Sequence, residues 1–235
     1  MIVVRPLLIA HRGAAQRAPE NTVEAFADAR RQGADGIEFD VRRTLDGVLV
    51  ISHDPVLSDM TPIASLRAAA LPATIPTLEE ALVACAGGLI NVEIKNDPRE
   101  PGHDPSGALS AQVVEEIADA GVAGQVIISS FDLKTLDAVR RVDSTIQTGF
   151  LVDLAADQML ALDQAIAHGL DALHPFVMHV TPTLVAAAHE GGLSLNTWTV
   201  NAEADLLTMA ERGVEAIITD DIPLALRTLG DEPTQ

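Results

Sequence analysis

Short apolar runs alternate with amphipathic segments along nearly the whole chain. The runs are rich in Val, Ile and Leu, a composition typical of strands that are buried on both faces of a parallel sheet. The segments between them have helical periodicity. We predict eight strands, at residues 7–11, 36–42, 89–95, 125–130, 145–151, 171–175, 193–199 and 215–220.

Eight alternations of strand and helix in 235 residues predict a (β/α)8 TIM barrel. A doubly wound open sheet shows the same alternation and is the structural alternative. The sequence contains no linker, low-complexity segment or internal repeat. We therefore expect a single domain that spans residues 1–235.

One further apolar run, residues 48–52, follows the second predicted strand after only a few residues. A parallel crossover needs about a dozen residues or more, so this run must form an extra antiparallel β-hairpin with that strand. Asp46 and Gly47 are typical of a two-residue type I′ turn. Centring the hairpin on this turn places His53 directly beside Asp40, so the hairpin returns a histidine to the strand end that it left.

Local signals also mark where helices begin and end. Asn21 precedes a helical pattern with Glu24 three residues on, and Thr77 with Glu80 repeats this arrangement. Both pairs indicate a capping box, in which side chains satisfy the first free N–H groups of a helix. Gly33, Gly121, Gly169 and Gly213 each fall near the end of a helical stretch, where a left-handed terminating residue is expected.

Composition narrows the classes of function. The chain has 15 basic and 34 acidic residues, a net charge of −19, and only 3% aromatic residues. These values argue against binding to nucleic acid, which needs basic surfaces and stacking platforms. The single cysteine excludes a disulfide framework and a cysteine zinc site. With no membrane-length apolar run and no signal-like core, we expect a soluble, cytoplasmic domain of the size of an enzyme, as a monomer or small homo-oligomer.

Carboxylates gather at the C-terminal ends of neighbouring predicted strands, where barrels place catalytic groups. Glu38 and Asp40 are two residues apart and share one face, as do Glu93 and Lys95. Three buried carboxylates repel one another unless a cation compensates them, and hard oxygen ligands suit Mg²⁺ or Ca²⁺. The alternative is that these carboxylates face outward and form salt bridges with helices.

Other strand-end residues supply further candidate chemistry. His11 and His53 are candidates for an acid–base pair, although each could also be a structural histidine. Arg12 and Lys95 could either neutralise the carboxylates or bind a phosphate. Trp198, the only tryptophan, could pack in the core or line a substrate pocket.

Taken together, the motifs resemble a known family. They are HRG at 11–13, PENT at 19–22, EFDV at 38–41, HDP at 53–55, NVEIK at 91–95, SSFD at 129–132, WTVN at 198–201 and ITDDIP at 218–223. This set, in this order, resembles the glycerophosphodiester phosphodiesterases of the short bacterial type, within the phospholipase-C-like barrel superfamily.

The resemblance implies a metal-dependent hydrolysis of glycerophosphodiesters to an alcohol and sn-glycerol 3-phosphate. It implies one divalent cation, Mg²⁺ or Ca²⁺, and a small-molecule glycerophosphodiester substrate, with no nucleic acid or membrane partner. The residues that match family positions are His11 and His53 for catalysis, Arg12, Lys95 and Trp198 for substrate binding, and Glu38, Asp40 and Glu93 for the metal. Asp220 lies in a matching motif, and we assign it no chemical role.

One departure from the family pattern concerns substrate choice. The segment after His53-Asp54 is shorter than the family's usual polar insertion, which leaves the preferred alcohol open. Two other classes also remain: a metal-dependent lyase or aldolase, with Lys95 as a Schiff-base lysine in one version, and a non-catalytic phosphate-binding barrel. A sphingomyelinase-D-like activity on anionic membranes is disfavoured by the charge of −19.

Overall fold

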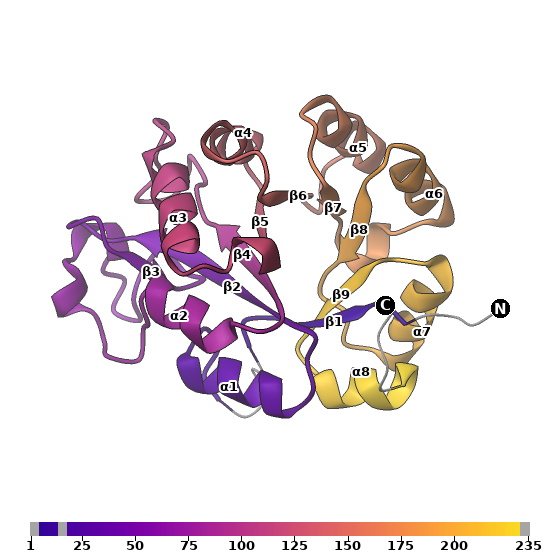
Figure 1. The fold of residues 1–235 in the computed structure, drawn as a ribbon, viewed down its shortest axis with the longest axis horizontal. Helices are drawn as coiled ribbons and strands as arrows, with labels where there is room; N and C mark the ends of the chain where they lie inside the picture. The colour runs from indigo at the N-terminus through magenta and orange to yellow at the C-terminus, as the bar shows by residue number, and fades with distance from the viewer. Residues whose placement is uncertain (1–4, 14–17, 231–235) are drawn as a thin grey trace.

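A computed structural model describes residues 5–13 and 18–230. Eight parallel strands form the barrel, and helices surround it (Figure 1). The strands are β1 (Leu7–Ala10), β2 (Gly36–Arg43), β4 (Leu89–Ile94), β5 (Val126–Ser130), β6 (Gln147–Leu151), β7 (Ala172–His174), β8 (Ser194–Thr197) and β9 (Ala216–Thr219). The helices are α1 (Val23–Arg31), α2 (Leu78–Cys85), α3 (Ala108–Asp119), α4 (Leu133–Val142), α5 (Gln158–Ala167), α6 (Pro182–Glu190), α7 (Glu203–Arg212) and α8 (Ile222–Leu229).

The sheet closes on itself. Strand β1 pairs with β9 on one side and with β2 on the other, both in parallel. This double pairing confirms the predicted (β/α)8 barrel and rules out the open doubly wound sheet. All eight predicted strands form at the expected places. The ends of the predicted domain, residues 1–4 and 231–235, lie outside the described residues.

The predicted hairpin is present, but its predicted register is wrong by one residue. Strand β3 (Leu49–Ile51) runs antiparallel to β2 with Arg42 opposite Val50, and Ser52 donates its N–H to the carbonyl of Asp40 at 2.9 Å. Ser52, not His53, therefore lies opposite Asp40. The predicted two-residue turn is also wrong. The N–H of Thr44 donates to the carbonyl of Val48, which leaves a three-residue loop. Gly47, the last residue of that loop, has a φ of +85°.

Helix α1 begins one residue later than its sequence signal indicates. Thr22 is the N-cap, and its hydroxyl accepts a hydrogen bond from the N–H of Ala25. Asn21 is not the cap because its side chain is bonded to Asp40 instead. The second predicted capping box is confirmed, since Thr77 and Glu80 satisfy each other's backbone N–H groups. The four predicted terminating glycines all have positive φ.

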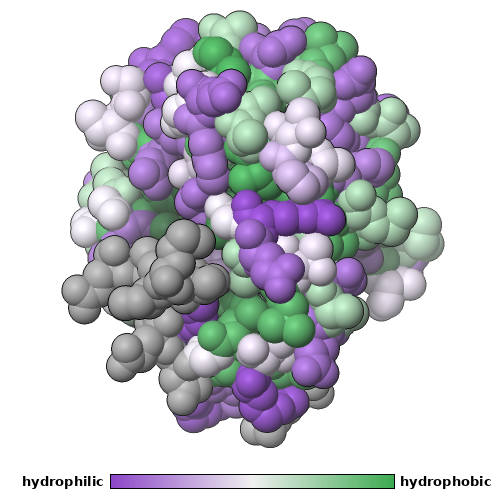
Figure 2. All heavy atoms as spheres, turned by 90° about the vertical axis from the view of Figure 1, so that its right-hand side faces the viewer, coloured by the Kyte–Doolittle hydropathy of each residue, from purple (hydrophilic) through white to green (hydrophobic). Residues whose placement is uncertain are grey.

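Apolar side chains fill the layer between the barrel and its helices. Phe26 of α1 and Phe39 of β2 are fully buried there, with ring centroids 5.6 Å apart. Because Phe39 faces outward to the helices, its neighbours Glu38 and Asp40 face the barrel interior. On the molecular face in Figure 2, polar and apolar residues are interspersed in small groups. Among the helices of the described residues, none is both long and apolar enough to cross a membrane.

Candidate active site

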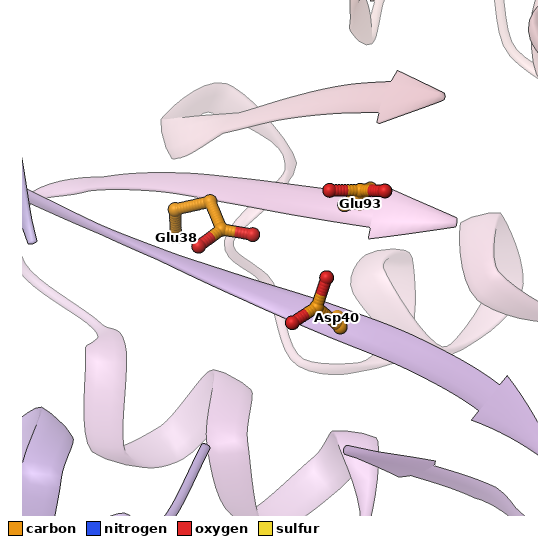
Figure 3. Close-up of side chains that lie close together, drawn as sticks. All are labelled: Glu38, Asp40 and Glu93. Carbon is orange, nitrogen blue, oxygen red and sulfur yellow. The ribbon is translucent and has the colours of Figure 1, made fainter. Parts of the chain in front are cut away.

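Three carboxylates from two adjacent strands converge at the C-terminal end of the barrel. Glu38 and Asp40 extend from β2 and Glu93 from β4, all toward one point (Figure 3). One oxygen from each lies within 4.8 Å of the others, and all three residues are buried. Register explains the convergence, because Asp40 pairs with Glu93 across the two strands. The predicted carboxylate cluster is therefore present, and its members face inward rather than toward the helices.

Two cationic side chains lie against this cluster. The ammonium nitrogen of Lys95 lies 2.5 Å from Glu93 Oε1 and 3.0 Å from Asp40 Oδ1. The Nε atom of Arg12 lies 3.5 Å from Asp40 Oδ2, and its backbone N–H donates to Glu38 at 2.9 Å. Both basic residues singled out in the sequence thus lie beside the carboxylates, with Asp40 between them.

The neighbours of each carboxylate shift its pKa. Burial alone would raise the pKa of Asp40, but the positive charges of Lys95 and Arg12 outweigh it and lower the pKa to about 2. Burial is the main cause that raises the pKa of Glu38 to about 8, and repulsion from the charge of Asp40 adds to it. Burial also raises the pKa of Glu93, although the charge of Lys95 opposes this shift. The two basic side chains therefore compensate Asp40 well and Glu38 poorly.

The loop between β1 and α1 holds Asp40 in place. Arg12 and Asn21 both have positive φ, 51° and 58°, and the N–H of Asn21 donates to the carbonyl of Arg12 at 2.9 Å. The Asn21 side chain donates to Asp40 Oδ2 at 2.8 Å. Non-glycine residues with positive φ are uncommon and cluster at functional sites, where neighbouring structure enforces them. Here Arg12 and Asn21, both with positive φ, approach the same carboxylate.

His11, which directly follows β1, is oriented by a carboxylate from β9. Its Nδ1 atom lies 2.7 Å from Asp220 Oδ1, and Asn201 donates to the other oxygen of Asp220 at 2.7 Å. Burial lowers the pKa of His11, but the hydrogen bond to Asp220 and the charge of Glu38 outweigh it, so that the pKa is raised overall. With Nδ1 bonded to Asp220, Nε2 is the nitrogen that remains for chemistry.

His53 reaches the site from the end of the hairpin. Its carbonyl accepts two hydrogen bonds from the guanidinium of Arg42, at 2.5 and 3.0 Å, and its Nδ1 atom lies 2.9 Å from Asp54 Oδ1. Burial and the positive charge of Lys95 lower the pKa of His53, while the charge of Asp40 opposes the shift. The two histidines therefore differ, since His53 is the more easily deprotonated.

A cavity of about 150 Å³ contains most of these groups. Its lining includes seven of the eight predicted site residues, all except Asp40. Trp198 forms part of the wall, where its indole N–H donates to the His174 carbonyl at 2.8 Å and its ring meets the edges of Phe131 and Phe176. The predicted residues are thus brought together around one cavity.

Four further residues of the site were not predicted from the sequence. Asn21 and Asp220 position Asp40 and His11, and Asp220, to which we assigned no chemical role, contacts His11 because barrel closure places β9 beside β1. Phe131 lines the cavity. Asn91 is 1% exposed and also lines the cavity, and its Oδ1 atom has no hydrogen-bond partner among residues 5–13 and 18–230. Its spacing of two residues from Glu93 could have shown that it faces inward.

The donor set fits a hard divalent cation. The grouped atoms are carboxylate oxygens, and the unpartnered Oδ1 of Asn91 adds a neutral oxygen on the strand position directly opposite Glu38. Mg²⁺ and Ca²⁺ are bound by oxygen ligands of this kind, whereas zinc in proteins is mostly held by nitrogen and sulfur. The raised pKa of Glu38 also indicates that Arg12 and Lys95 do not compensate all three carboxylates.

Known proteins resemble this chain throughout its length. A glycerophosphodiester phosphodiesterase of Caldanaerobacter subterraneus subsp. tengcongensis is 33% identical, over 93% of this chain and 95% of its own. The structure of an Oleispira antarctica phosphodiesterase in complex with the product sn-glycerol-3-phosphate superposes with a TM-score of 0.79 at 25% identity, covering 96% of both chains. A glycerophosphodiester phosphodiesterase of Thermotoga maritima superposes with a TM-score of 0.80 at 25% identity, covering 95% of this chain and 98% of its own.

The family assignment comes from the sequence as a whole. The glycerophosphoryl diester phosphodiesterase family model matches residues 11–71 and 64–224, which include every site residue described above. The strand ends that carry the carboxylates and histidines lie inside these matches. The chain therefore belongs to the glycerophosphoryl diester phosphodiesterase family.

Proposed function

We propose that the chain hydrolyses glycerophosphodiesters to an alcohol and sn-glycerol 3-phosphate with a divalent cation, Mg²⁺ or Ca²⁺. The observation that carries this proposal is the meeting of a three-carboxylate cluster and two histidines at one small cavity. Carboxylates alone would fit many metal sites, but a pair of histidines with opposite pKa shifts adds an acid and a base. The product bound to the Oleispira antarctica relative supports the substrate class.

Glu38, Asp40 and Glu93 would hold the cation, with Asn91 Oδ1 as an additional neutral oxygen. When bound, the cation supplies Lewis-acid withdrawal of charge from the phosphoryl group. Arg12 and Lys95 lie on either side of Asp40, and we assign to them the stabilisation of charge on the phosphoryl oxygens.

The two histidines divide the proton transfers. His53, with its lowered pKa, accepts the proton of the glycerol 2-hydroxyl as that oxygen attacks phosphorus. His11, with its raised pKa and its Nδ1 bonded to Asp220, donates a proton from Nε2 to the departing alcohol oxygen. Water then opens the cyclic 1,2-phosphate while the two histidines exchange roles. Trp198 forms a wall for the glycerol.

The aldolase alternative fits this geometry poorly. A Schiff base forms from a neutral amine, but Lys95 is paired with both Glu93 and Asp40. Burial lowers the pKa of Lys95, yet those two carboxylates outweigh it and raise the pKa above its ordinary value. Lys95 is therefore held as an ammonium ion, which suits an interaction with phosphate.

The test is a coupled assay for release of glycerol 3-phosphate, before and after chelation of divalent cations. We expect turnover with glycerophosphodiesters, its loss on chelation, and its return when Mg²⁺ or Ca²⁺ is added. Tight phosphate binding without any turnover would favour the non-catalytic alternative. Turnover that is insensitive to chelation would contradict the assignment of the three carboxylates.

A further inference from the structure

A second, larger cavity adjoins the candidate active site. Its volume is about 710 Å³, and it lies at the C-terminal ends of β4, β5 and β6. It shares four lining residues with the smaller cavity, namely Glu93, Lys95, Phe131 and Leu151. The two cavities are therefore neighbouring compartments with a common wall.

Two residues of that shared lining, Lys95 and Phe131, lie close together. The Lys95 ammonium lies 5.9 Å from the Phe131 ring centroid, and Phe131 meets Trp198 edge-on at 5.8 Å. A phosphodiester has two ester arms on one phosphorus. If the phosphate is beside Lys95 and the glycerol arm is against Trp198, the other arm points past Phe131 into the larger cavity. That arm is the leaving alcohol.

The lining of the larger cavity combines apolar side chains with an excess of acidic ones. Phe131, which is 43% exposed, contributes to the floor together with Phe150, Leu151, Leu160 and Ala161. Six acidic residues line the cavity: Glu93, Asp97, Glu100, Asp132, Asp153 and Asp157. The lining contains two basic residues, Lys95 and Arg99.

Ion pairing separates these carboxylates into two groups. Glu93, Asp97 and Glu100 are paired with Lys95, Arg99 and Arg42, respectively. Asp132, Asp153 and Asp157 have no basic partner within 4.0 Å among residues 5–13 and 18–230. Their oxygens accept bonds from backbone N–H groups instead, at the starts of α4 and α5 and in the loop before α5. Fixed carboxylates beside exposed aromatic surface form a binding site for an organic cation.

We propose that the larger cavity binds the leaving alcohol and selects an alcohol that carries an amino or quaternary ammonium group. This inference rests on the proposed function. The carboxylates attract such a group and the phenylalanine rings contact its methyl or methylene groups, whereas an alcohol with a negative charge is repelled. Residues 54–76, which follow the hairpin, line neither cavity. The selection therefore depends on the loops after β4, β5 and β6, and not on the shortened segment after His53-Asp54.

The experiment compares glycerol phosphodiesters of choline, glycerol and serine with the wild-type chain and with the double variant Asp153→Asn, Asp157→Asn. Asparagine keeps the backbone hydrogen bonds of both positions and removes the charge. Asp143→Asn is the matched control, because Asp143 accepts a similar backbone bond from Thr145 and does not line the cavity.

We expect the wild type to have its highest kcat/KM with the choline ester and its lowest with the serine ester. The double variant should lose about tenfold in kcat/KM with the choline ester and stay within about twofold with the glycerol ester. The preference for choline should also decrease as ionic strength rises. The control variant should behave as the wild type does.

Two outcomes would overturn the inference while leaving the proposed function intact. One is a wild type that hydrolyses the glycerol or serine ester better than the choline ester. The other is a double variant that changes all three substrates equally, since that would indicate a structural effect. If the wild type hydrolyses none of the diesters with added cation, the proposed function fails and this inference fails with it.

Discussion

Asp220 and His11, which are 209 positions apart in the sequence, form a 2.7 Å contact between Oδ1 and Nδ1. The contact exists because β1 and β9 are adjacent in the closed barrel. It fixes the orientation of the imidazole and leaves Nε2 for the proton transfer that we propose for His11. Asn201 holds Asp220 from the other side, by two hydrogen bonds.

Replacing Asp220 by asparagine should alter the pH dependence of the enzyme. Since the bond to Asp220 raises the pKa of His11, its weakening lowers that pKa. If His11 must be protonated to act as the acid, activity at alkaline pH is lost as pH rises through this pKa. The alkaline limb of kcat/KM should therefore move to lower pH in Asp220→Asn, with a loss in kcat of roughly 10- to 100-fold.

The matched control for this prediction is Asp221→Asn. Asp221 is the adjacent carboxylate and caps α8 by accepting the N–H of Leu224, a bond that asparagine can also make. This variant should keep the wild-type pH profile. An unchanged alkaline limb in Asp220→Asn would show that His11 is not the group that must be protonated.

The histidines themselves give the most direct test of acid–base catalysis. His11→Ala and His53→Ala should each reduce kcat by roughly 10²- to 10⁴-fold, because each removes one proton-transfer group. His168→Ala is the control, since His168 pairs with Asp137 away from the cavity. Circular dichroism checks that each variant is folded. Full activity in either of the first two variants would refute the proposed mechanism.

Asn91 should contribute to cation binding. Asn91 lines the cavity opposite Glu38 on the neighbouring strand, and its Oδ1 has no partner within the described part of the chain, so Asn91→Ala removes an available oxygen. We expect Mg²⁺ or Ca²⁺ affinity, measured by calorimetry without substrate, to decrease by about tenfold. Asn196→Ala is the control, because Asn196 is also buried but bonds to His174. Equal affinity in the wild type and Asn91→Ala would exclude this role.

Substitutions of the adjacent residues Asn21 and Thr22 should have different effects, one on cation binding and the other on stability. Thr22→Ala removes the N-cap of α1 and should lower the free energy of unfolding by about 1 kcal/mol, without changing cation affinity. Asn21→Ala removes the amide that positions Asp40 and should weaken cation binding. Urea unfolding and calorimetry measure the two effects. If both variants changed only stability, Asn21 would have a structural role alone.

Much of this protein is determined by local sequence. The strands, the turn region at Asp46-Gly47 and the capping box at Thr77 depend on neighbouring residues, so periodicity and cap signals located them correctly. The spacing of Glu38 and Asp40 places both carboxylates on one face in any strand. A barrel wound in sequence order then brings Glu93 beside them, which is why the carboxylate cluster could be predicted.

The remaining features depend on contacts between distant segments, which only the tertiary structure decides. Asn21 has an N-cap sequence signal, but Asp40 competes for its side chain, and so Thr22 caps the helix. The hairpin register is an exception, because it depends on a local bond between Thr44 and Val48. This bond leaves three loop residues where Asp46-Gly47 also suits a two-residue turn. Asp220 gains a partner through barrel closure, and the larger cavity exists because loops after three strands converge. Local patterns specify which face a residue occupies, whereas packing specifies what it meets there.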